Sequence, residues 1–159
     1  MLKKSGRGVY LEEVNEGVLR HLSGSGRGAK VLDVGCGTGA LGERLEELGY
    51  EVTAIELDDS SATTAASRMT RVIHGDVRDF EAISKELHGE RFQYLVFSDI
   101  LEHLADPQAV IAYYLTYLET EGIVIISLPN FVVWETRLLM LLGRFDYRDY
   151  GVRDRSHLR

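Results

Sequence analysis

Four acidic residues stand at or near the ends of short apolar stretches, and their types and spacing could do chemistry. They are Asp33, Glu56, Asp76 and Asp99. Carboxylates accept hydrogen bonds from ammonium, hydroxyl and amino groups. If the four stretches are parallel strands, their carboxyl ends meet at one edge of a sheet, where open α/β sheets bind ligands. Such a rim suits a cationic ligand that carries a ribose and an adenine.

A glycine-rich turn, Gly35-Cys36-Gly37-Thr38-Gly39, follows the first of these stretches. Its glycines allow the backbone to approach a ligand closely. Residues 37–42 also fit the dinucleotide pattern G-x-G-x-x-G, with Glu56 at a suitable distance, so an NAD site is an alternative. Against NAD, a carboxylate at Asp33 would oppose a pyrophosphate but suits an amino-acid ammonium, and a nicotinamide site leaves Asp76 unexplained.

The elements that must position these residues are strands and helices, and the spacing of apolar residues along the chain alternates between the patterns typical of each. Apolar, β-branched or aromatic runs predict five short strands at 30–34, 51–56, 71–74, 92–97 and 122–127. Helical spacing and caps predict helices at 11–22, 39–48 and 80–87 and from Asp106-Pro107 to about Leu118. This order predicts an α/β fold, a three-layer Rossmann-like arrangement with a mostly parallel, doubly wound sheet.

Together, the segments 31–39, 75–76 and 98–104 and the residue Glu56 resemble the class I S-adenosylmethionine-dependent methyltransferases. The stretch Ser98-Asp99-Ile100-Leu101-Glu102-His103-Leu104 is most similar to the small-molecule branch, near the ubiquinone-biosynthesis O-methyltransferases. The resemblance covers about residues 29–130. It implies S-adenosyl-L-methionine as cofactor, S-adenosyl-L-homocysteine as product, and methyl transfer to a small-molecule acceptor at oxygen.

The resemblance also implies cofactor-binding roles in four segments. In the family the glycine turn holds the methionine moiety with an acidic residue near the ammonium. Acidic residues after the second and third strands meet the ribose hydroxyls and the adenine amino group, and the segment after the fourth lines the methionine side. The matching residues are Asp33, Gly35, Cys36, Gly37 and Gly39 in the turn, Glu56 and Leu57, Asp76 and Val77, and Ser98 and Asp99.

Structural roles stay open for several of these residues. Asp33 and Asp99 could be helix caps or partners of a buried arginine, and Ser98 could be structural. Cys36 is expected to be a small packing residue rather than a nucleophile. We expect Glu56 to occupy an exposed position on the rim.

His103 is the candidate catalytic residue, because it follows the fourth strand and an imidazole can accept a hydroxyl proton near neutral pH. The alternative is that its side chain orders the loop from Leu101 to Pro107. No compact set of histidine and acidic ligands predicts a metal site.

Size and composition bound the remaining possibilities. The 159 residues fit a single domain, divided into an N-terminal helix and loop (1–28), a cofactor-binding core (29–130) and a C-terminal helix and tail (131–159). A net charge of -7 disfavours nucleic acid as a partner. The single cysteine and the absence of a secretory leader predict a cytoplasmic protein, and residues 131–142 are too interrupted by polar groups to predict a membrane span.

The family usually continues beyond the fifth strand with further strands, whereas this sequence ends at Arg159. We therefore expect a shortened form, and an alternative function is a noncatalytic binding subunit that acts through a partner. An uncovered fifth strand would offer unpaired backbone groups, which predicts a homodimer through that edge or the segment Phe131–Leu142 folded over it.

Overall fold

The computed structural model describes residues 14–22, 26–130 and 141 of the chain. The strands among these residues are β1 (Lys30–Val34), β2 (Glu51–Glu56), β3 (Arg71–His74), β4 (Phe92–Ser98) and β5 (Leu118–Ser127). The helices are α1 (Glu16–Leu22), α2 (Ala40–Glu47), α3 (Asp59–Ala66), α4 (Phe80–Leu87) and α5 (Pro107–Leu115), with a 3-10 turn, η1 (Leu101–His103).

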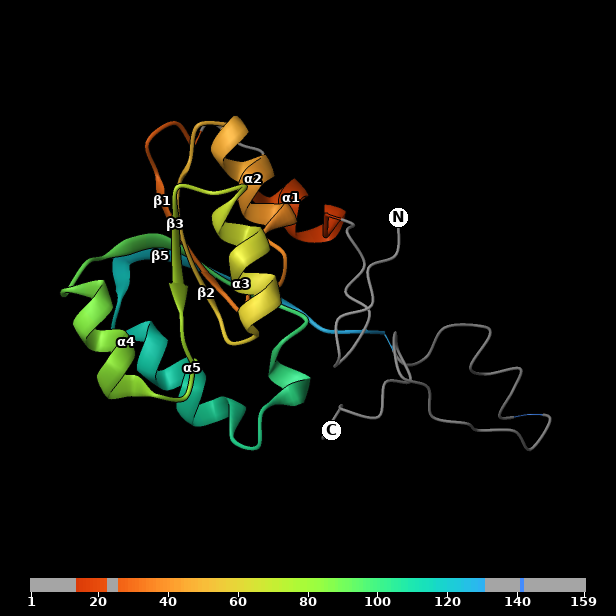
Figure 1. The fold of residues 1–159 in the computed structure, drawn as a ribbon, viewed down its shortest axis with the longest axis vertical. Coiled ribbons are helices and arrows are strands. Elements are labelled where there is room, and N and C mark those ends of the chain that lie inside the picture. The colour runs from red at the N-terminus through yellow and green to blue at the C-terminus, as the bar shows by residue number, and fades with distance from the viewer. Residues whose placement is uncertain (1–13, 23–25, 131–140, 142–159) are drawn as a thin grey trace.

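The strands form one parallel sheet in the order β3-β2-β1-β4-β5. Helices α1, α2 and α3 lie on one side of this sheet, and α4 and α5 lie on the other (Figure 1). The predicted three-layer, doubly wound fold is therefore confirmed. The strand order reverses between β1 and β4, so the point at which such sheets bind ligands lies at the carboxyl ends of those two strands.

The alternation of side chains along each strand divides the core into two clusters. On β1, Val31 belongs to the cluster that includes α1 and α2, whereas Leu32 and Val34 belong to the cluster with α4 and α5. The same division holds for β4, where Val96 faces α1 and α2 and its neighbours Leu95 and Phe97 face the opposite side. Because strand side chains alternate between faces, Asp33 and Ser98 belong to the face of α1 and α2.

Most predicted elements agree with the structure, and the differences lie in the bounds of three elements and in one helix. The predicted helix over 11–22 is wrong in part, since Val14 and Asn15 lie outside α1 and residues 11–13 lie outside the described residues. Strand β5 begins four residues before its predicted start, and α5 ends at Leu115 rather than Leu118. Helix α3 was not predicted at all.

The sheet has two edges within the part of the chain that the structure describes, β3 and β5. Large apolar side chains are exposed on β5, namely Ile123 and Ile126, with exposed fractions of 51% and 46%. The predicted covering segment, Phe131–Leu142, lies outside the described residues apart from Leu141.

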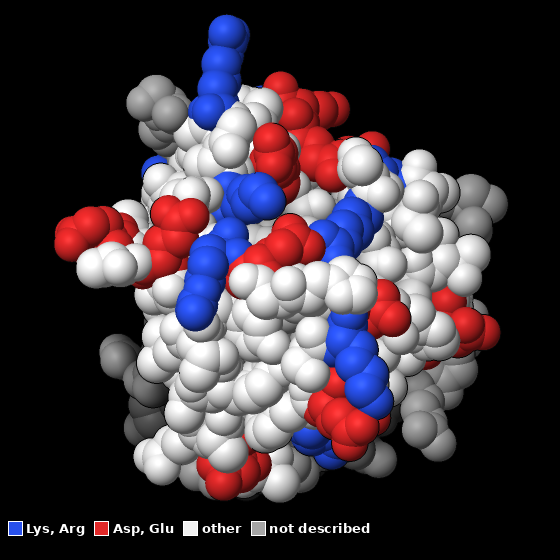
Figure 2. Space-filling view, turned by 90° about the vertical axis from the view of Figure 1, so that its left-hand side faces the viewer, with Lys and Arg blue, Asp and Glu red and all other residues white. Residues whose placement is uncertain are grey.

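Two further observations concern the surface. Among the described residues, no helix is both long enough and apolar enough to cross a membrane. On the face shown in Figure 2, basic and acidic side chains lie next to one another rather than in separate patches. Ion pairs such as Lys30–Glu90 (3.5 Å) and Lys85–Glu81 (2.7 Å) reflect this mixing.

Candidate functional site

Asp33 is the most unusual side chain at the carboxyl end of β1. It is 1% exposed, and neither carboxyl oxygen has a hydrogen-bond partner among the described residues. Burial first, and the charge of Glu56 second, raise the pKa of Asp33 from 3.8 to about 7. A buried carboxyl without a partner is costly, so the site holds one carboxyl group that none of the described residues satisfies.

The glycine turn after β1 is held to the end of β2 by hydrogen bonds. The backbone N–H groups of Gly35 and Cys36 both donate to the Ile55 carbonyl (2.9 and 3.1 Å), and the Gly37 N–H donates to Glu56 Oε2 (2.8 Å). The other Glu56 oxygen accepts from the Asp58 N–H (2.8 Å). The Glu56 side chain therefore helps to fix the conformation of the glycine turn.

The expectation that Glu56 lies exposed on the rim is wrong, since the side chain is only 7% exposed. Burial raises the pKa of the Glu56 carboxyl, while the N–H groups of Asp58 and Gly37 lower it in part. The neighbouring Leu57 is 56% exposed. The predicted pair at the end of β2 thus consists of one buried acid and one exposed apolar side chain.

Two of the turn glycines leave space that other elements fill. A Cβ at Gly35 would lie 2.2 Å from Ile100 Cδ1, so the segment after β4 packs directly on the turn. A Cβ at Gly39 would lie 2.9 Å from Ala65 of α3 and 3.0 Å from Met69 Sδ. Both glycines have positive φ angles, 83° and 80°. A side chain at either position would therefore be strained and crowded.

Cys36 lies half-buried within the turn, with its thiol donating to the Gly37 carbonyl at 3.6 Å. Burial, followed by the charges of Asp33 and Glu56, raises the pKa of the Cys36 thiol. A raised pKa disfavours the thiolate, which is the nucleophilic form. The environment therefore favours the packing interpretation of Cys36.

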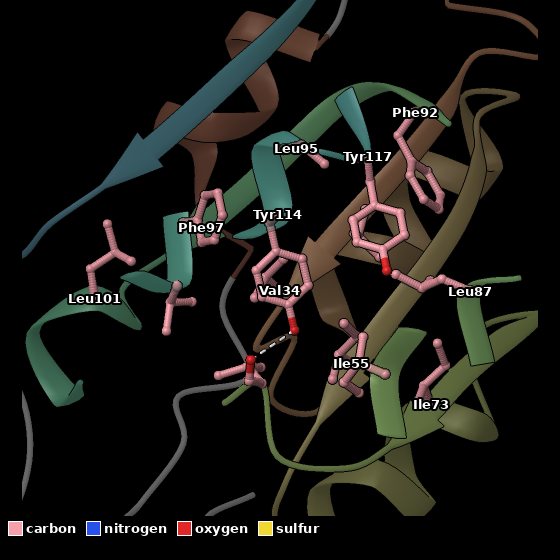
Figure 3. Close-up of a cluster of buried hydrophobic side chains, with 14 of the residues drawn as sticks. Val34, Ile55, Ile73, Leu87, Phe92, Leu95, Phe97, Leu101, Tyr114 and Tyr117 are labelled. Carbon is pink, nitrogen blue, oxygen red and sulfur yellow. Dashed lines mark hydrogen bonds between the residues drawn. The ribbon is translucent and has the colours of Figure 1, made fainter. Parts of the chain in front are cut away.

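The loop after β3 is fixed from two directions. The Arg78 guanidinium and backbone N–H donate to the Asp76 carboxylate, with distances of 2.5–3.1 Å, and these bonds lower the pKa of Asp76. From α5, the hydroxyl of the fully buried Tyr114 donates to the Val77 carbonyl at 3.0 Å. Figure 3 shows this bond, with the Tyr114 ring among core side chains that include Val34 and Phe97.

Tyr114 is a residue that the sequence analysis did not select. Its neighbour Tyr113 donates to the Phe80 carbonyl (2.8 Å), so α5 anchors both ends of the segment from Val77 to Phe80. Buried tyrosine hydroxyls usually find such partners. The aromatic run in α5 was a signal for packing, but its target in the chain could not be read from the sequence.

Ser98 and Asp99 meet a second residue that the sequence analysis did not select, Asn15. The Asn15 side-chain NH2 group lies 3.1 Å from Ser98 Oγ, 3.2 Å from Asp99 Oδ2 and 2.9 Å from Ser127 Oγ, and its two hydrogens are shared among these three acceptors. An asparagine before an apolar helical run is an N-cap signal, and that signal could have shown where α1 begins.

His103 is exposed at the end of η1, and its backbone N–H donates to the Ile100 carbonyl at 3.0 Å. The turn that holds it begins at Asp99, whose φ angle of 52° is left-handed. His103 is therefore on the same post-β4 turn as Ser98 and Asp99. Two further groups of predicted site residues can be distinguished. One group surrounds the glycine turn and consists of Asp33, Cys36 and Glu56. The other lies just after β3 and consists of Asp76 and Val77.

A hollow of about 520 Å³ lies at the opposite end of the sheet. Its walls include the first residues of four strands, namely Lys30, Glu51, Arg71 and Phe92. Lys30 and Arg71 both form ion pairs with Glu90 there. This hollow is separate from the carboxyl-end site. No group of three or more histidine, cysteine or acidic side chains that could hold a metal ion occurs within the described ranges.

Comparisons with known proteins show which family the chain resembles. A model of the family described as "Methionine biosynthesis protein MetW" matches residues 18–149. A ubiquinone biosynthesis O-methyltransferase of Azotobacter vinelandii is 34% identical over 138 residues, which cover 77% of this chain and 58% of that protein. The corresponding protein of Actinobacillus pleuropneumoniae is 29% identical over 127 residues, covering 73% and 52%.

Solved structures show the same fold. A SAM-dependent methyltransferase of Archaeoglobus fulgidus has a TM-score of 0.68 at 18% identity, covering 91% of this chain and 59% of its own. A TehB-like SAM-dependent methyltransferase of Corynebacterium glutamicum has a TM-score of 0.54 at 26% identity, covering 63% and 54%.

The strand order, the glycine turn and these likenesses define the Rossmann-like fold of the class I S-adenosylmethionine-dependent methyltransferases. Within that class, the chain belongs to the MetW family, whose model matches most of its length. The chain spans about half the length of the curated relatives just described, 52% and 58%.

Proposed function

We propose that this protein binds S-adenosylmethionine and transfers its methyl group to a small-molecule acceptor, at oxygen. The observation that carries the proposal is the buried carboxyl of Asp33, which has no partner among the described residues and lies ahead of the glycine turn. An ammonium group would supply the missing partner. A ligand with an amino-acid end and an adenosine end fits a rim that has acidic residues at several strand ends.

The residues present fit that cofactor in chemical type. Asp33 would support the ammonium, and the turn glycines would let the backbone approach the methionine moiety. The Glu56 oxygens accept backbone N–H groups of Gly37 and Asp58, and because a carboxylate has about four acceptor sites, the group can still accept from ribose hydroxyls. We assign Leu57 to the ribose side, Asp76 and Val77 to the adenine, and Ser98 and Asp99 to the methionine side.

The bound cofactor supplies a methyl group already activated by a positively charged sulfur. The protein then chiefly has to hold the acceptor in line and exclude water, and such positioning can account for roughly 7–11 kcal/mol of a barrier. The turn from Asp99 to His103 borders the carboxyl ends of β4 and β5 and is the part of the site that would meet the acceptor.

We propose His103 as the group that accepts the acceptor's hydroxyl proton. The test is His103→Gln, which keeps a polar side chain but removes the titrating ring. Turnover should fall by about 10²–10⁴, the range for general-base catalysis, with the affinity for S-adenosylhomocysteine unchanged. Full turnover in the variant would favour the loop-ordering role.

The names of the family and of the relatives bear on the chemical class of the acceptor. The family description refers to methionine biosynthesis, whereas the curated relatives are named for ubiquinone biosynthesis. The names of these relatives support an oxygen target. A turnover assay with labelled donor against sugars, quinols and carboxylic acids would identify the acceptor class.

Calorimetry tests the donor site directly. Wild-type protein should bind S-adenosylhomocysteine and not NAD, and Glu56→Gln should weaken that binding at least about tenfold, since hydrogen bonds to a charged group contribute about 1.5–3 kcal/mol. Because Glu56 also holds Gly37 and Asp58, the variant should unfold more easily as well. Saturable NAD binding without a response to S-adenosylhomocysteine would overturn the proposal. Donor binding without turnover on any acceptor would favour the noncatalytic subunit.

Three further proposals concern the whole chain. We propose a single domain with a C-terminal helix and tail over 131–159, a cytoplasmic location, which the single cysteine supports, and no nucleic-acid partner, which the net charge of -7 supports. We also propose that two copies associate through the edge of β5, which is supported by its exposed isoleucines Ile123 and Ile126.

A further inference from the structure

Asn15 joins the start of α1 to the carboxyl ends of two strands more than eighty residues away. Its Oδ1 accepts the Val18 N–H at 3.2 Å and so caps α1. Its amide group donates to Ser98, Asp99 and Ser127, at 2.9–3.2 Å. One side chain thus serves both the helix and the strand ends.

The sheet register explains why these acceptors lie together. Ser98 and Ser127 are paired residues at the ends of β4 and β5. Val96 and Ile125, two residues before each serine, pack in the cluster that contains Val18 of α1. Because side chains repeat every two residues along a strand, both serines face α1, where Asn15 is.

The hydrogen bonds around Asp99 have a consistent direction. Ser127 Oγ donates to Asp99 Oδ1 at 2.8 Å, which leaves the serine oxygen able to accept from Asn15. Asn15 donates to the other oxygen, Oδ2, and the Asp99 N–H donates to the Ser127 carbonyl at 3.1 Å. Both carboxylate oxygens are therefore held by side chains, and one backbone group is held by β5.

These bonds support an unfavourable backbone conformation. Asp99 has a φ angle of 52°, in the left-handed region that few non-glycine residues adopt, although aspartate adopts it more readily than most. The turn that results brings Ile100 so close to Gly35 that a Cβ there would lie 2.2 Å from Ile100 Cδ1. The chain of contacts runs from Asn15 through Asp99 and Ile100 to the glycine turn.

We propose that Asn15 is a positioning residue, which couples the docking of α1 to the shape of the Ser98–Ile100 turn and thereby raises affinity for the methionine end of the donor. This inference rests on the proposed function, because it assigns a role within the same site. Asn15 acts through Asp99 and Ile100, so its effect should be confined to the end of the ligand that lies against that turn.

Two substitutions separate the capping role of Asn15 from its amide donation. Asn15→Asp and Asn15→Ser both keep a side chain that can cap α1, because aspartate, serine and asparagine are comparable N-caps. Both lose the amide donor, and the aspartate also adds a charge beside Asp99. Asp106→Ala is the matched control, since it removes the cap of another helix, α5, where Asp106 accepts the Ala109 N–H at 3.0 Å.

The ligands are S-adenosylhomocysteine and adenosine, which share the nucleoside but differ in the amino-acid end. For Asn15→Ser, calorimetry should show affinity for S-adenosylhomocysteine falling about tenfold, as expected for about 1.4 kcal/mol of lost hydrogen bonding, and affinity for adenosine changing less than about twofold. Asn15→Asp should lose more. In an Asp99→Asn background, Asn15→Asp should cost less than in the wild type, because the two residues interact directly.

Each outcome decides the proposal. Unchanged affinity for S-adenosylhomocysteine in both Asn15 variants would overturn it, and so would an equal loss for the two ligands, which would indicate a structural role only. Similar losses in Asp106→Ala would also point to general destabilisation. If the wild-type protein binds neither ligand, the proposed function itself is wrong, which is a different result from selective failure of the variants.

Discussion

At the scale of single residues, the buried carboxyl of Asp33 destabilises the fold when it ionises, and it is also the group that we propose binds the ammonium of the ligand. Its carboxyl is buried without a partner in the described part of the chain, and its pKa is raised to about 7. The pKa of Asp33 is higher in the folded state than its unfolded value of 3.8. The stability that protonated Asp33 contributes is therefore fully present below about pH 4 and is lost as the pH rises through 7. A shift of this size corresponds to roughly 4 kcal/mol.

The first prediction follows from that sign. Asp33→Asn should already be somewhat more stable than the wild type at pH 5 and should be clearly more stable at pH 8, because the amide does not ionise. Urea unfolding at both pH values measures the difference. A constant difference between the two proteins across this range would contradict the raised pKa.

The same residue predicts a proton release on binding. An ammonium beside Asp33 favours the carboxylate, so wild-type affinity for S-adenosylhomocysteine should rise with pH up to about 7 and then level off. Calorimetry in buffers of different ionisation enthalpy counts the released protons. Asp33→Asn should bind more weakly at pH 8 and release none from this position.

At the scale of elements, α3 matters because it packs against the turn that opens α2. The Cα and Cβ atoms of Ala65 lie 2.9 Å from the position of a Cβ on Gly39. Arg68, just beyond α3, also donates to the Thr38 carbonyl at 3.3 Å. The glycine turn is therefore supported by α3 on one side and by Glu56 on the other.

The second prediction compares two glycines with left-handed φ angles, Gly39 (80°) and Gly89 (75°). Gly89→Ala should cost only the conformational term, about 1–2 kcal/mol, because nothing lies within 4 Å of its new Cβ. Gly39→Ala should cost more, since the methyl group also displaces α3. Thermal unfolding measures both, and equal losses would show that the close packing at Gly39 is unimportant.

Sequence patterns predicted the elements with strong periodicity and missed those defined by contacts. The five strands were predicted because they contain apolar runs rich in β-branched or aromatic residues, such as Ile123–Ile126. Helix α3 (DSSATTAA) was missed because it has no apolar stripe, although its N-cap, Asp58, which accepts the Ser61 N–H at 2.9 Å, was a local signal of its start. Glycine spacing predicted a turn after β1, but the burial of Glu56 depends on how that turn is hydrogen-bonded to the end of β2.

The contacts of Asn15 lay beyond any pattern in the chain. An N-cap can be read from a local sequence, but the amide of Asn15 reaches Ser98 and Ser127 only because β4 and β5 pair in one register. A shift of one residue would turn both serines to the other face of the sheet.

At the scale of the whole molecule, the third prediction concerns association through β5. An edge strand with exposed apolar side chains is a template for pairing with another chain, and the 122–127 part of β5 carries no charged side chain. Light scattering coupled to size exclusion should show dimers of the wild-type protein at high concentration, and Ile126→Lys should shift them to monomers. Leu48→Lys, at an exposed apolar position that caps the end of α2, is the control and should leave the dimer intact. A wild-type protein that stays monomeric would disprove the association.

The strand order also determines when the neighbours of β1 become available during synthesis of the chain. Strand β1 pairs first with β2, but its other neighbour, β4, lies about sixty residues further along the chain. At a ribosomal rate of about 5–20 residues per second, β4 emerges roughly 3–12 seconds later. Until then one side of β1, including Asp33, has no neighbour, so the nascent chain passes through a stage in which the glycine turn exists without a closed binding site.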